Sequence, residues 1–471
     1  MRSHVSDPES SSFIGDCRRL AAMFLRQILP IGKPANKQLF LSALRLQSTT
    51  ASAAATTSVP AGDAQLVKIE NDASKRIVTV HWANGNSGRF PYIWLRDCSP
   101  DPATYTIGPA MTARNLHMRS FDINASPLNV NLAENGRELK VEWPEGIRST
   151  YTSDWLAFRN PSNLKAREHR RKVYLRDLKL WDRQYIEKNV QKFDHDAALN
   201  DDKTLHDFLY AVCTDGLALL VNGPHHDRLA VEKIGQRIGL IHQTHFGKVF
   251  EVSTKPDASN MAYANSGELP LHTDFPSLTT PPQLQMLHMI QKADEGGLSV
   301  FVDGFHVAEQ LRKERPDVFE ILSTYEAEYI EQGYDKHEVD GVEKTFDYDM
   351  TARHKIIELR NDGSIKRVTF GNAMRSWFYD VDDEEKIQQI YNAMKVFTEY
   401  CYDSKNLYQF QLENGETMLW ANSRLLHARS AFRTVNHSRT LMGCYFAWDI
   451  LKSRVRVIRD KLNLPENQPS A

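Results

Sequence analysis

A short motif, His272-Thr273-Asp274, and a histidine far along the chain, His427, constrain the fold more than any other feature of this sequence. Side chains alternate between the two faces of a strand, so one strand can present His272 and Asp274 on the same side. A third ligand from His427 then requires a distant strand to lie beside the first. Two imidazoles and one carboxylate can occupy one face of an octahedral metal ion, as in non-haem Fe(II) oxygenases.

The motif does not identify a metal site by itself. His-x-Asp is common by chance, and an exposed loop pair with an unrelated buried histidine also accounts for it. Arg439, twelve residues after His427, adds a second feature. A guanidinium on a following strand could pair with a dicarboxylate co-substrate, which favours an oxygenase.

The pattern of apolar residues predicts a mainly β fold with helices. Short apolar runs such as Gly216–Val221 are typical of strands, and helical inserts are expected at Val307–Thr324 and Glu384–Tyr400. We expect a C-terminal double-stranded β-helix (jelly-roll) core over residues 195–460.

A small β-rich domain is predicted over residues 66–165. Arg76–Trp82 alternates in polarity, and Phe90–Leu95 resumes extended structure after a turn. Asn135-Gly136 then introduces Glu138–Trp143, which is a second hairpin signal.

Residues 1–63 are expected to lie outside the fold. No Asp or Glu occurs from Cys17 to Gly62, whereas arginines, serines and apolar residues at helical spacing do occur there. This composition is typical of a mitochondrial transit peptide. The alternative is a disordered extension on a cytoplasmic protein.

Charge and cysteine usage exclude several classes of protein. The net charge of −2 argues against a nucleic-acid binder, which normally carries a basic stripe. The five cysteines are scattered and odd in number, so no disulfide framework is expected. No apolar run is long enough to span a bilayer, so membrane insertion is not expected.

A set of short motifs resembles one family over residues 66–460, the 2-oxoglutarate oxygenases that comprise γ-butyrobetaine dioxygenase and trimethyllysine dioxygenase. Lys355–Leu359 and Gly371-Asn372-Ala373 are more similar to the butyrobetaine branch. The motifs that carry the resemblance are Trp94-Leu95-Arg96-Asp97, Trp143-Pro144, Asp154-Trp155-Leu156, His272-Thr273-Asp274, Gly296-Gly297, Val302-Asp303-Gly304-Phe305, Leu425-Leu426-His427 and Gly443-Cys444-Tyr445.

The resemblance implies a metal site, a co-substrate site and a substrate class for this chain. His272, Asp274 and His427 would hold Fe(II), and Arg439 would pair with the far carboxylate of 2-oxoglutarate. O2 would be consumed, ascorbate would support activity, and carnitine biosynthesis would be the pathway. The partner would be a small trimethylammonium acid, and a homodimer is left open as the assembly.

An aromatic cage for the trimethylammonium group is implied by the same resemblance. The family usually has Tyr at the position of Phe246 and Trp at that of Phe250, so this cage should bind a cation more weakly. Taken singly, each ring is more simply read as core packing. The expected substrate-binding residues are Phe246, Phe250, Asn260, Tyr263, Asn372 and Tyr445.

The N-terminal domain departs from the butyrobetaine branch, which carries a structural zinc on three cysteines and one histidine. Here the corresponding positions are Ser99, Asp101, Thr104 and Ile147. One neighbouring thiol, Cys98, cannot close a tetrahedral site, so zinc is not expected.

Other functions stay open from the sequence. Trimethyllysine or another trimethylammonium acid could be the substrate in place of γ-butyrobetaine. A catalytically silent cupin-like binding protein could retain the three ligands. A metal-dependent isomerase or hydrolase on the same barrel would need neither O2 nor Arg439.

Overall fold

The computed structural model describes residues 65–102, 104–107, 112–168, 178–254, 265–339 and 342–464. The expectation for residues 1–63 lies outside them. Among the described helices, none combines the length and the apolar character that a membrane crossing requires.

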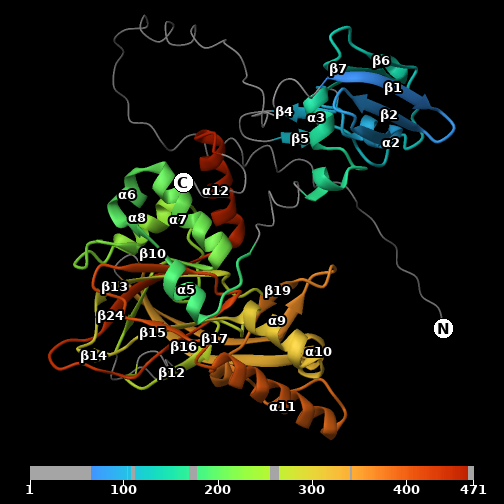
Figure 1. Cartoon of the computed structure of the whole chain (residues 1–471). Coiled ribbons are helices and arrows are strands. Elements are labelled where there is room, and N and C mark those ends of the chain that lie inside the picture. The colour runs from blue at the N-terminus through green and yellow to red at the C-terminus, as the bar shows by residue number, and fades with distance from the viewer. Residues whose placement is uncertain are drawn as a thin grey trace, which may run out of the picture. The chain divides into compact units, whose positions relative to one another are not determined.

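The N-terminal unit consists of small antiparallel sheets packed on one core (Figure 1). Val78, Val80 and Trp82 are buried at alternate positions of one strand, as the polarity pattern predicted. The strands are β1 (Leu66–Asp72), β2 (Ile77–Trp82), β3 (Ser87–Pro91), β4 (Tyr105–Ile107), β5 (Thr112–Arg114), β6 (Asn129–Leu132), β7 (Glu138–Glu142) and β8 (Arg148–Thr152). The helices are α2 (Tyr92–Asp97), η1 (Pro144–Gly146) and α3 (Ser153–Phe158).

Hydrogen bonds connect three of the positions that correspond to the family's zinc site. Asp101 accepts from the Ser99 hydroxyl and, at 3.1 Å, from the Ser149 hydroxyl, and its backbone carbonyl accepts from Thr104 N at 3.0 Å. The fourth position, Ile147, packs against the apolar core. The absence of zinc stays a prediction.

The C-terminal body contains two main sheets. The larger has the order β11-β24-β13-β21-β10-β9, and the smaller has the order β12-β22-β15-β20. The larger comprises β9 (Gln191–Asp194), β10 (Leu217–Val221), β11 (Phe250–Ser253), β13 (Leu284–Gln291), β21 (Thr417–Trp420) and β24 (Thr440–Phe446). The smaller comprises β12 (Leu269–His272), β15 (Ser299–Asp303), β20 (Tyr408–Phe410) and β22 (Leu425–Arg429).

An apolar core lies between the two sheets, and helices cover their outer faces. Met418 and Trp420 of the larger sheet share this core with Phe301 and Leu425 of the smaller one. The larger sheet is covered by α6 (His195–Asn200), α7 (Asp202–Asp215), α8 (Ala230–Ile238) and α12 (Trp448–Lys461). The smaller is covered by α9 (Gly304–Glu314), α10 (Pro316–Thr324) and α11 (Glu384–Cys401). Both helical groups are visible in Figure 1, and the expected mainly β fold class is confirmed.

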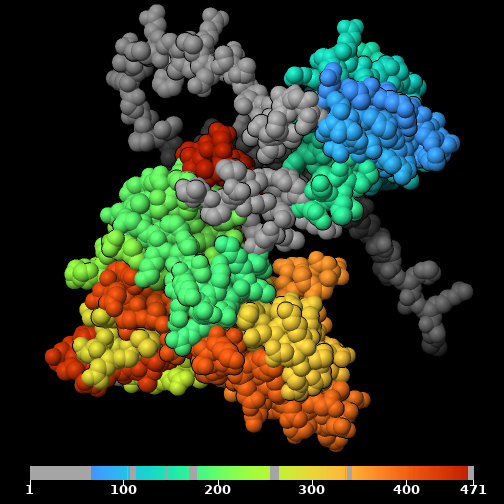
Figure 2. Space-filling model, viewed as in Figure 1, coloured from blue at the N-terminus to red at the C-terminus, as the bar shows by residue number. Residues whose placement is uncertain are grey.

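A long hairpin, which the sequence did not reveal, follows α10. It consists of β16 (Glu326–Val339) and β17 (Val342–Lys355), paired along their whole length. In Figure 2 the yellow and orange surface at the lower right of the body lies where Figure 1 shows α9, α10 and α11. The remaining short elements are α5 (Arg183–Asn189), β14 (Glu295–Gly296), β18 (Ile357–Leu359), β19 (Ile365–Val368), η3 (Asn372–Met374) and β23 (Phe432–Arg433).

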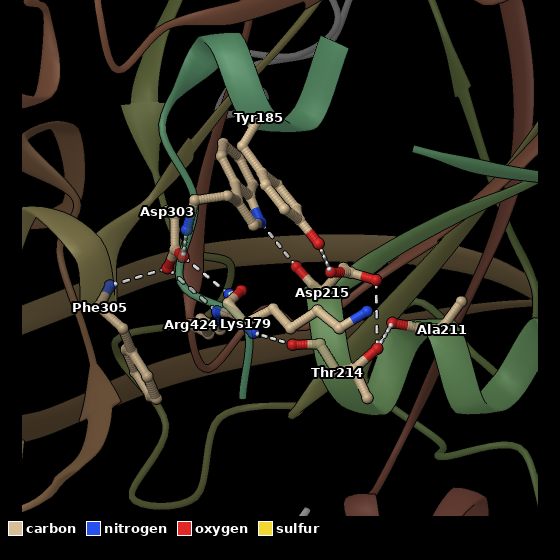
Figure 3. A network of polar contacts seen from close by, with 9 residues as sticks. Lys179, Tyr185, Ala211, Thr214, Asp215, Asp303, Phe305 and Arg424 are labelled. Carbon is tan, nitrogen blue, oxygen red and sulfur yellow. Dashed lines mark hydrogen bonds and ion pairs between the residues drawn. The ribbon is translucent and has the colours of Figure 1, made fainter. Parts of the chain in front are cut away.

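A buried ion pair between Asp303 and Arg424 holds several elements together (Figure 3). Asp303 ends β15 and accepts from Arg424 Nε at 3.0 Å and Nη2 at 2.7 Å. Arg424 also donates to the carbonyls of Thr214 and Lys179, at 2.8 and 2.6 Å. The backbone N–H of Trp181 donates to Asp303 at 3.0 Å. The network therefore fixes Arg424, which directly precedes β22 and lies three residues before His427.

Candidate metal centre

Two neighbouring strands bring His272 and His427 together, as the spacing of the motif required. The two residues are direct partners in the antiparallel pairing of β12 with β22, and their ring centroids lie 4.2 Å apart. Asp274 Oδ1 lies 3.2 Å from His272 Nε2 and 3.5 Å from His427 Nε2. One ligand atom from each residue lies within 4.8 Å of the others. The three side chains thus converge on one point.

Neighbouring groups orient each of the three side chains. His272 Nδ1 lies 2.8 Å from the carbonyl of Pro270, so it carries the proton and leaves Nε2 as the ligand atom. The Tyr445 hydroxyl donates to Asp274 Oδ2 at 2.7 Å, which leaves Oδ1 beside the two imidazoles. The ring of Trp420, from the larger sheet, packs 5.0 Å from that of His427.

Asn422 fixes the backbone at the carboxylate. Its Oδ1 accepts from the N–H of Asp274 at 2.8 Å, and its Nδ2 donates to the carbonyls of Asp274 and Pro282. The next residue, Phe275, has a φ of 55°, a conformation that bulky side chains rarely adopt. The chain therefore turns sharply immediately after the carboxylate.

The charge state of the cluster suits a divalent cation. Burial alone would raise the pKa of Asp274, but His427, His272 and the Tyr445 hydroxyl hold it at about 2. Burial and the nearby His272 lower the pKa of His427 to about 3. An ionised carboxylate and neutral imidazoles are the forms that bind metal. Two histidines and one carboxylate fit Fe(II) and leave positions for other ligands.

Arg439 directly precedes β24 and is 6% exposed. Burial and the charge of Arg429 lower its pKa to about 10. Among the described residues, Arg439 makes no ion pair and its Nε has no hydrogen-bond partner. A Cβ at Gly297, whose φ is 69°, would lie 3.1 Å from that nitrogen, so glycine leaves the guanidinium room. A buried cation with an unused donor fits an anionic group such as a carboxylate.

Four aromatic rings form a cluster beside Asp274. The ring of Phe250 stacks on that of Tyr445 at 5.0 Å, and the ring of Phe246 lies 5.9 Å from that of Phe250. Phe275 completes the cluster at 5.5 Å from Phe246 and 5.4 Å from Tyr445. The three described residues of the expected cage are therefore neighbours. The cluster of Phe246, Phe250, Phe275 and Tyr445 is called the aromatic cluster below.

The other three expected substrate residues are not part of the aromatic cluster as the structure describes it. Asn260 and Tyr263 lie outside the described residues. Asn372 begins η3, is exposed, and accepts from Arg375 Nε at 3.2 Å. The sequence reasoning missed Phe275 and Asn422. Phe275 could have been found by its place directly after Asp274, whereas Asn422 gave no comparable signal.

Comparison with known proteins identifies relatives over most of the chain. Residues 176–445 match the taurine catabolism dioxygenase TauD, TfdA family, and residues 69–157 match the gamma-butyrobetaine hydroxylase-like N-terminal family. Gamma-butyrobetaine dioxygenase of Homo sapiens is 30% identical, with 82% of this chain and 95% of that protein covered. The enzyme of the same name from Pseudomonas sp. (strain AK-1) is 32% identical, with 81% and 94% covered. Trimethyllysine dioxygenase of Bos taurus is 27% identical, with 80% and 85% covered.

Proposed function

The chain belongs to the TauD/TfdA family of 2-oxoglutarate-dependent dioxygenases, and from this premise we propose that it hydroxylates γ-butyrobetaine to L-carnitine. One observation carries the proposal: the three metal-ligating side chains converge beside an aromatic cluster, and Tyr445 of that cluster donates a hydrogen bond to Asp274. The buried Arg439, whose Nε has no partner among the described residues, supports it. The relatives with the highest identities given above bear the name gamma-butyrobetaine dioxygenase.

Each group would have a defined role in the reaction. His272, Asp274 and His427 would hold Fe(II), and Arg439 would pair with the far carboxylate of 2-oxoglutarate. When bound, iron and co-substrate supply the oxidation: O2 gives one oxygen atom to the substrate and one to succinate, with release of CO2. Tyr445 would keep Asp274 oriented through its hydroxyl while its ring takes part in the cage. The aromatic cluster would position the trimethylammonium group and exclude water.

A turnover assay with γ-butyrobetaine and trimethyllysine in parallel tests this proposal. Hydroxylated product and succinate should form in equal amounts with γ-butyrobetaine, and only in the presence of Fe(II) and 2-oxoglutarate. Faster turnover of trimethyllysine would assign the chain to the other branch. No substrate-dependent succinate with either compound would favour a silent binding protein.

Replacement of Arg439 by alanine should raise the KM for 2-oxoglutarate by roughly ten- to a hundred-fold. The reason is the loss of charge-assisted hydrogen bonds worth about 1.5–3 kcal/mol each. Steady-state kinetics with varied 2-oxoglutarate measure the effect. Arg433→Ala is the matched control, because Arg433 is exposed and pairs with Glu295. Equal KM values for the two variants would place the co-substrate elsewhere.

Truncation of the Phe250 side chain should weaken the binding of γ-butyrobetaine more than the binding of 2-oxoglutarate. Phe250→Ala removes one π-face, and a cation–π contact is worth about 0.5–2 kcal/mol, so KM for γ-butyrobetaine should rise roughly two- to thirty-fold. Phe410→Ala serves as control, because Phe410 is a partly buried ring on β20 of the smaller sheet that stacks on Tyr408 at 5.1 Å. A parallel rise in both KM values would identify Phe250 as a packing residue.

A mitochondrial location is a further part of the proposal. It is supported by the acid-poor composition of residues 17–62 and by the name of the Bos taurus relative, which includes the word mitochondrial. Imaging of the full chain beside a variant that lacks residues 1–63 tests it. Stimulation by ascorbate and homodimer formation stay predictions.

A further inference from the structure

The hairpin β16–β17 places the carboxylate of Glu331 on its inward face. Ala327 and Tyr329 are 2% and 1% exposed, and Glu331 is the next residue on the same face because side chains alternate along a strand. In the register of the hairpin, Glu331 pairs with Met350, and the neighbouring inward pair is Gly333 with Tyr348. A carboxylate thus continues a buried stripe of the hairpin.

The surroundings of Glu331 include the segment that follows the metal-ligating carboxylate. Its Oε2 accepts from the hydroxyl of Ser277 at 2.9 Å, and Ser277 is three residues after Asp274. Among the described residues, Glu331 makes no ion pair with a cationic side chain. Burial first, and then the charge of Asp274, raise the pKa of Glu331. A partly buried carboxylate without a cationic neighbour favours a ligand that brings positive charge.

The inward face of the hairpin also meets the rings near the metal centre. The ring of Tyr348 lies 4.6 Å from that of His245. His245 in turn lies 4.1 Å from Phe246 and 5.2 Å from Phe275, two members of the aromatic cluster. Glu331 is therefore bonded to Ser277, two residues after Phe275, and the next inward residue of its strand, Gly333, pairs with Tyr348, whose ring contacts His245.

We propose that Glu331 is a specificity-determining residue, whose carboxylate faces the quaternary ammonium of the substrate beside the aromatic cluster. This inference rests on the proposed function and adds a residue to its site. A quaternary ammonium cannot donate a hydrogen bond, so π-faces and a negative charge are the groups that can stabilise it. In this cage, phenylalanines stand where the family has better cation–π partners, and a carboxylate would supply attraction that the rings lack.

The test compares γ-butyrobetaine with its neutral isostere 5,5-dimethylhexanoate, in which a carbon replaces the quaternary nitrogen. The parent enzyme should bind the cation more tightly than the isostere. In Glu331→Gln, this preference should fall by about tenfold or more, because the charge attraction is lost at nearly constant side-chain volume. The KM for 2-oxoglutarate should not change. Glu331→Asp keeps the charge and should retain most of the preference.

Glu328→Gln is the matched control. Glu328 lies on the other face of the same strand and also accepts from a serine hydroxyl, that of Ser376, at 2.8 Å. The Glu328→Gln substitution should leave the preference for γ-butyrobetaine over the neutral isostere unchanged. An equal loss for both compounds in Glu331→Gln, or an unchanged preference, would overturn the role of Glu331. Failure of the parent enzyme to turn over γ-butyrobetaine would instead overturn the proposed function.

Discussion

Substitution of Asp274 by alanine should reduce hydroxylation by at least about a thousandfold. The change removes one of three metal ligands, and outer partners of such ligands alone are worth about 10- to 100-fold. The fold should survive, because the backbone N–H of Asp274 stays bonded to Asn422. Substrate-dependent succinate formation measures the activity, and bound iron is measured in the same preparation.

A graded control is available at the same carboxylate. Tyr445→Phe removes the hydroxyl that donates to Asp274 Oδ2 but keeps the aromatic ring, so its loss should be about 10- to 100-fold. Circular dichroism and thermal unfolding separate loss of ligation from loss of structure. Near-normal activity in Asp274→Ala would refute the metal assignment, whatever the result for Tyr445→Phe.

Removal of the buried Arg424 should lower the free energy of unfolding by about 3–5 kcal/mol, because Asp303 loses its ionic partner at a buried position. The two side chains are 3% and 0% exposed, so water cannot replace the lost guanidinium. The carbonyls of Thr214 and Lys179 lose a donor as well. Denaturant unfolding of Arg424→Ala measures the effect.

An exposed pair gives the comparison for this variant. Arg433 and Glu295 are 61% and 65% exposed, and breaking such a surface pair costs about 0–1 kcal/mol. Arg433→Ala should therefore unfold at nearly the same denaturant concentration as the parent. A cost for Arg424→Ala no larger than that for Arg433→Ala would show that the network of Figure 3 does not stabilise the body.

The pairing of distant strands was predictable because metal chemistry demands it. Three ligands from two segments can meet only if the segments are neighbours, and His272 and His427 are direct partners. The helical insert after Val307 was also predicted, although it is two helices, separated at Arg315 and Pro316. Proline cannot continue a helix interior, so it starts the second one.

Other parts of the site left no usable pattern. Along β16, the inward positions hold Ala327, Tyr329, Glu331 and Gly333. Because two of these four residues are not apolar, the alternation of apolar and polar residues that marks a strand is lost there. Asn422 acts through hydrogen bonds to backbone groups of Asp274 and Pro282, which are remote in sequence. Such contacts depend on tertiary structure, so local patterns cannot reveal them.

The two sheets carry different parts of the enzyme. The histidines belong to the smaller sheet, on β12 and β22, whereas Phe250 and Tyr445 belong to the larger one, on β11 and β24. The proposed substrate residues of the larger sheet can therefore change without moving the two histidines proposed to ligate iron. Tyr445 is the exception, because its hydroxyl donates to Asp274 and its loss would also affect that carboxylate. A gene duplicate of this chain could acquire a new substrate through changes in β11 and the loop before it, with its oxidative chemistry inherited intact.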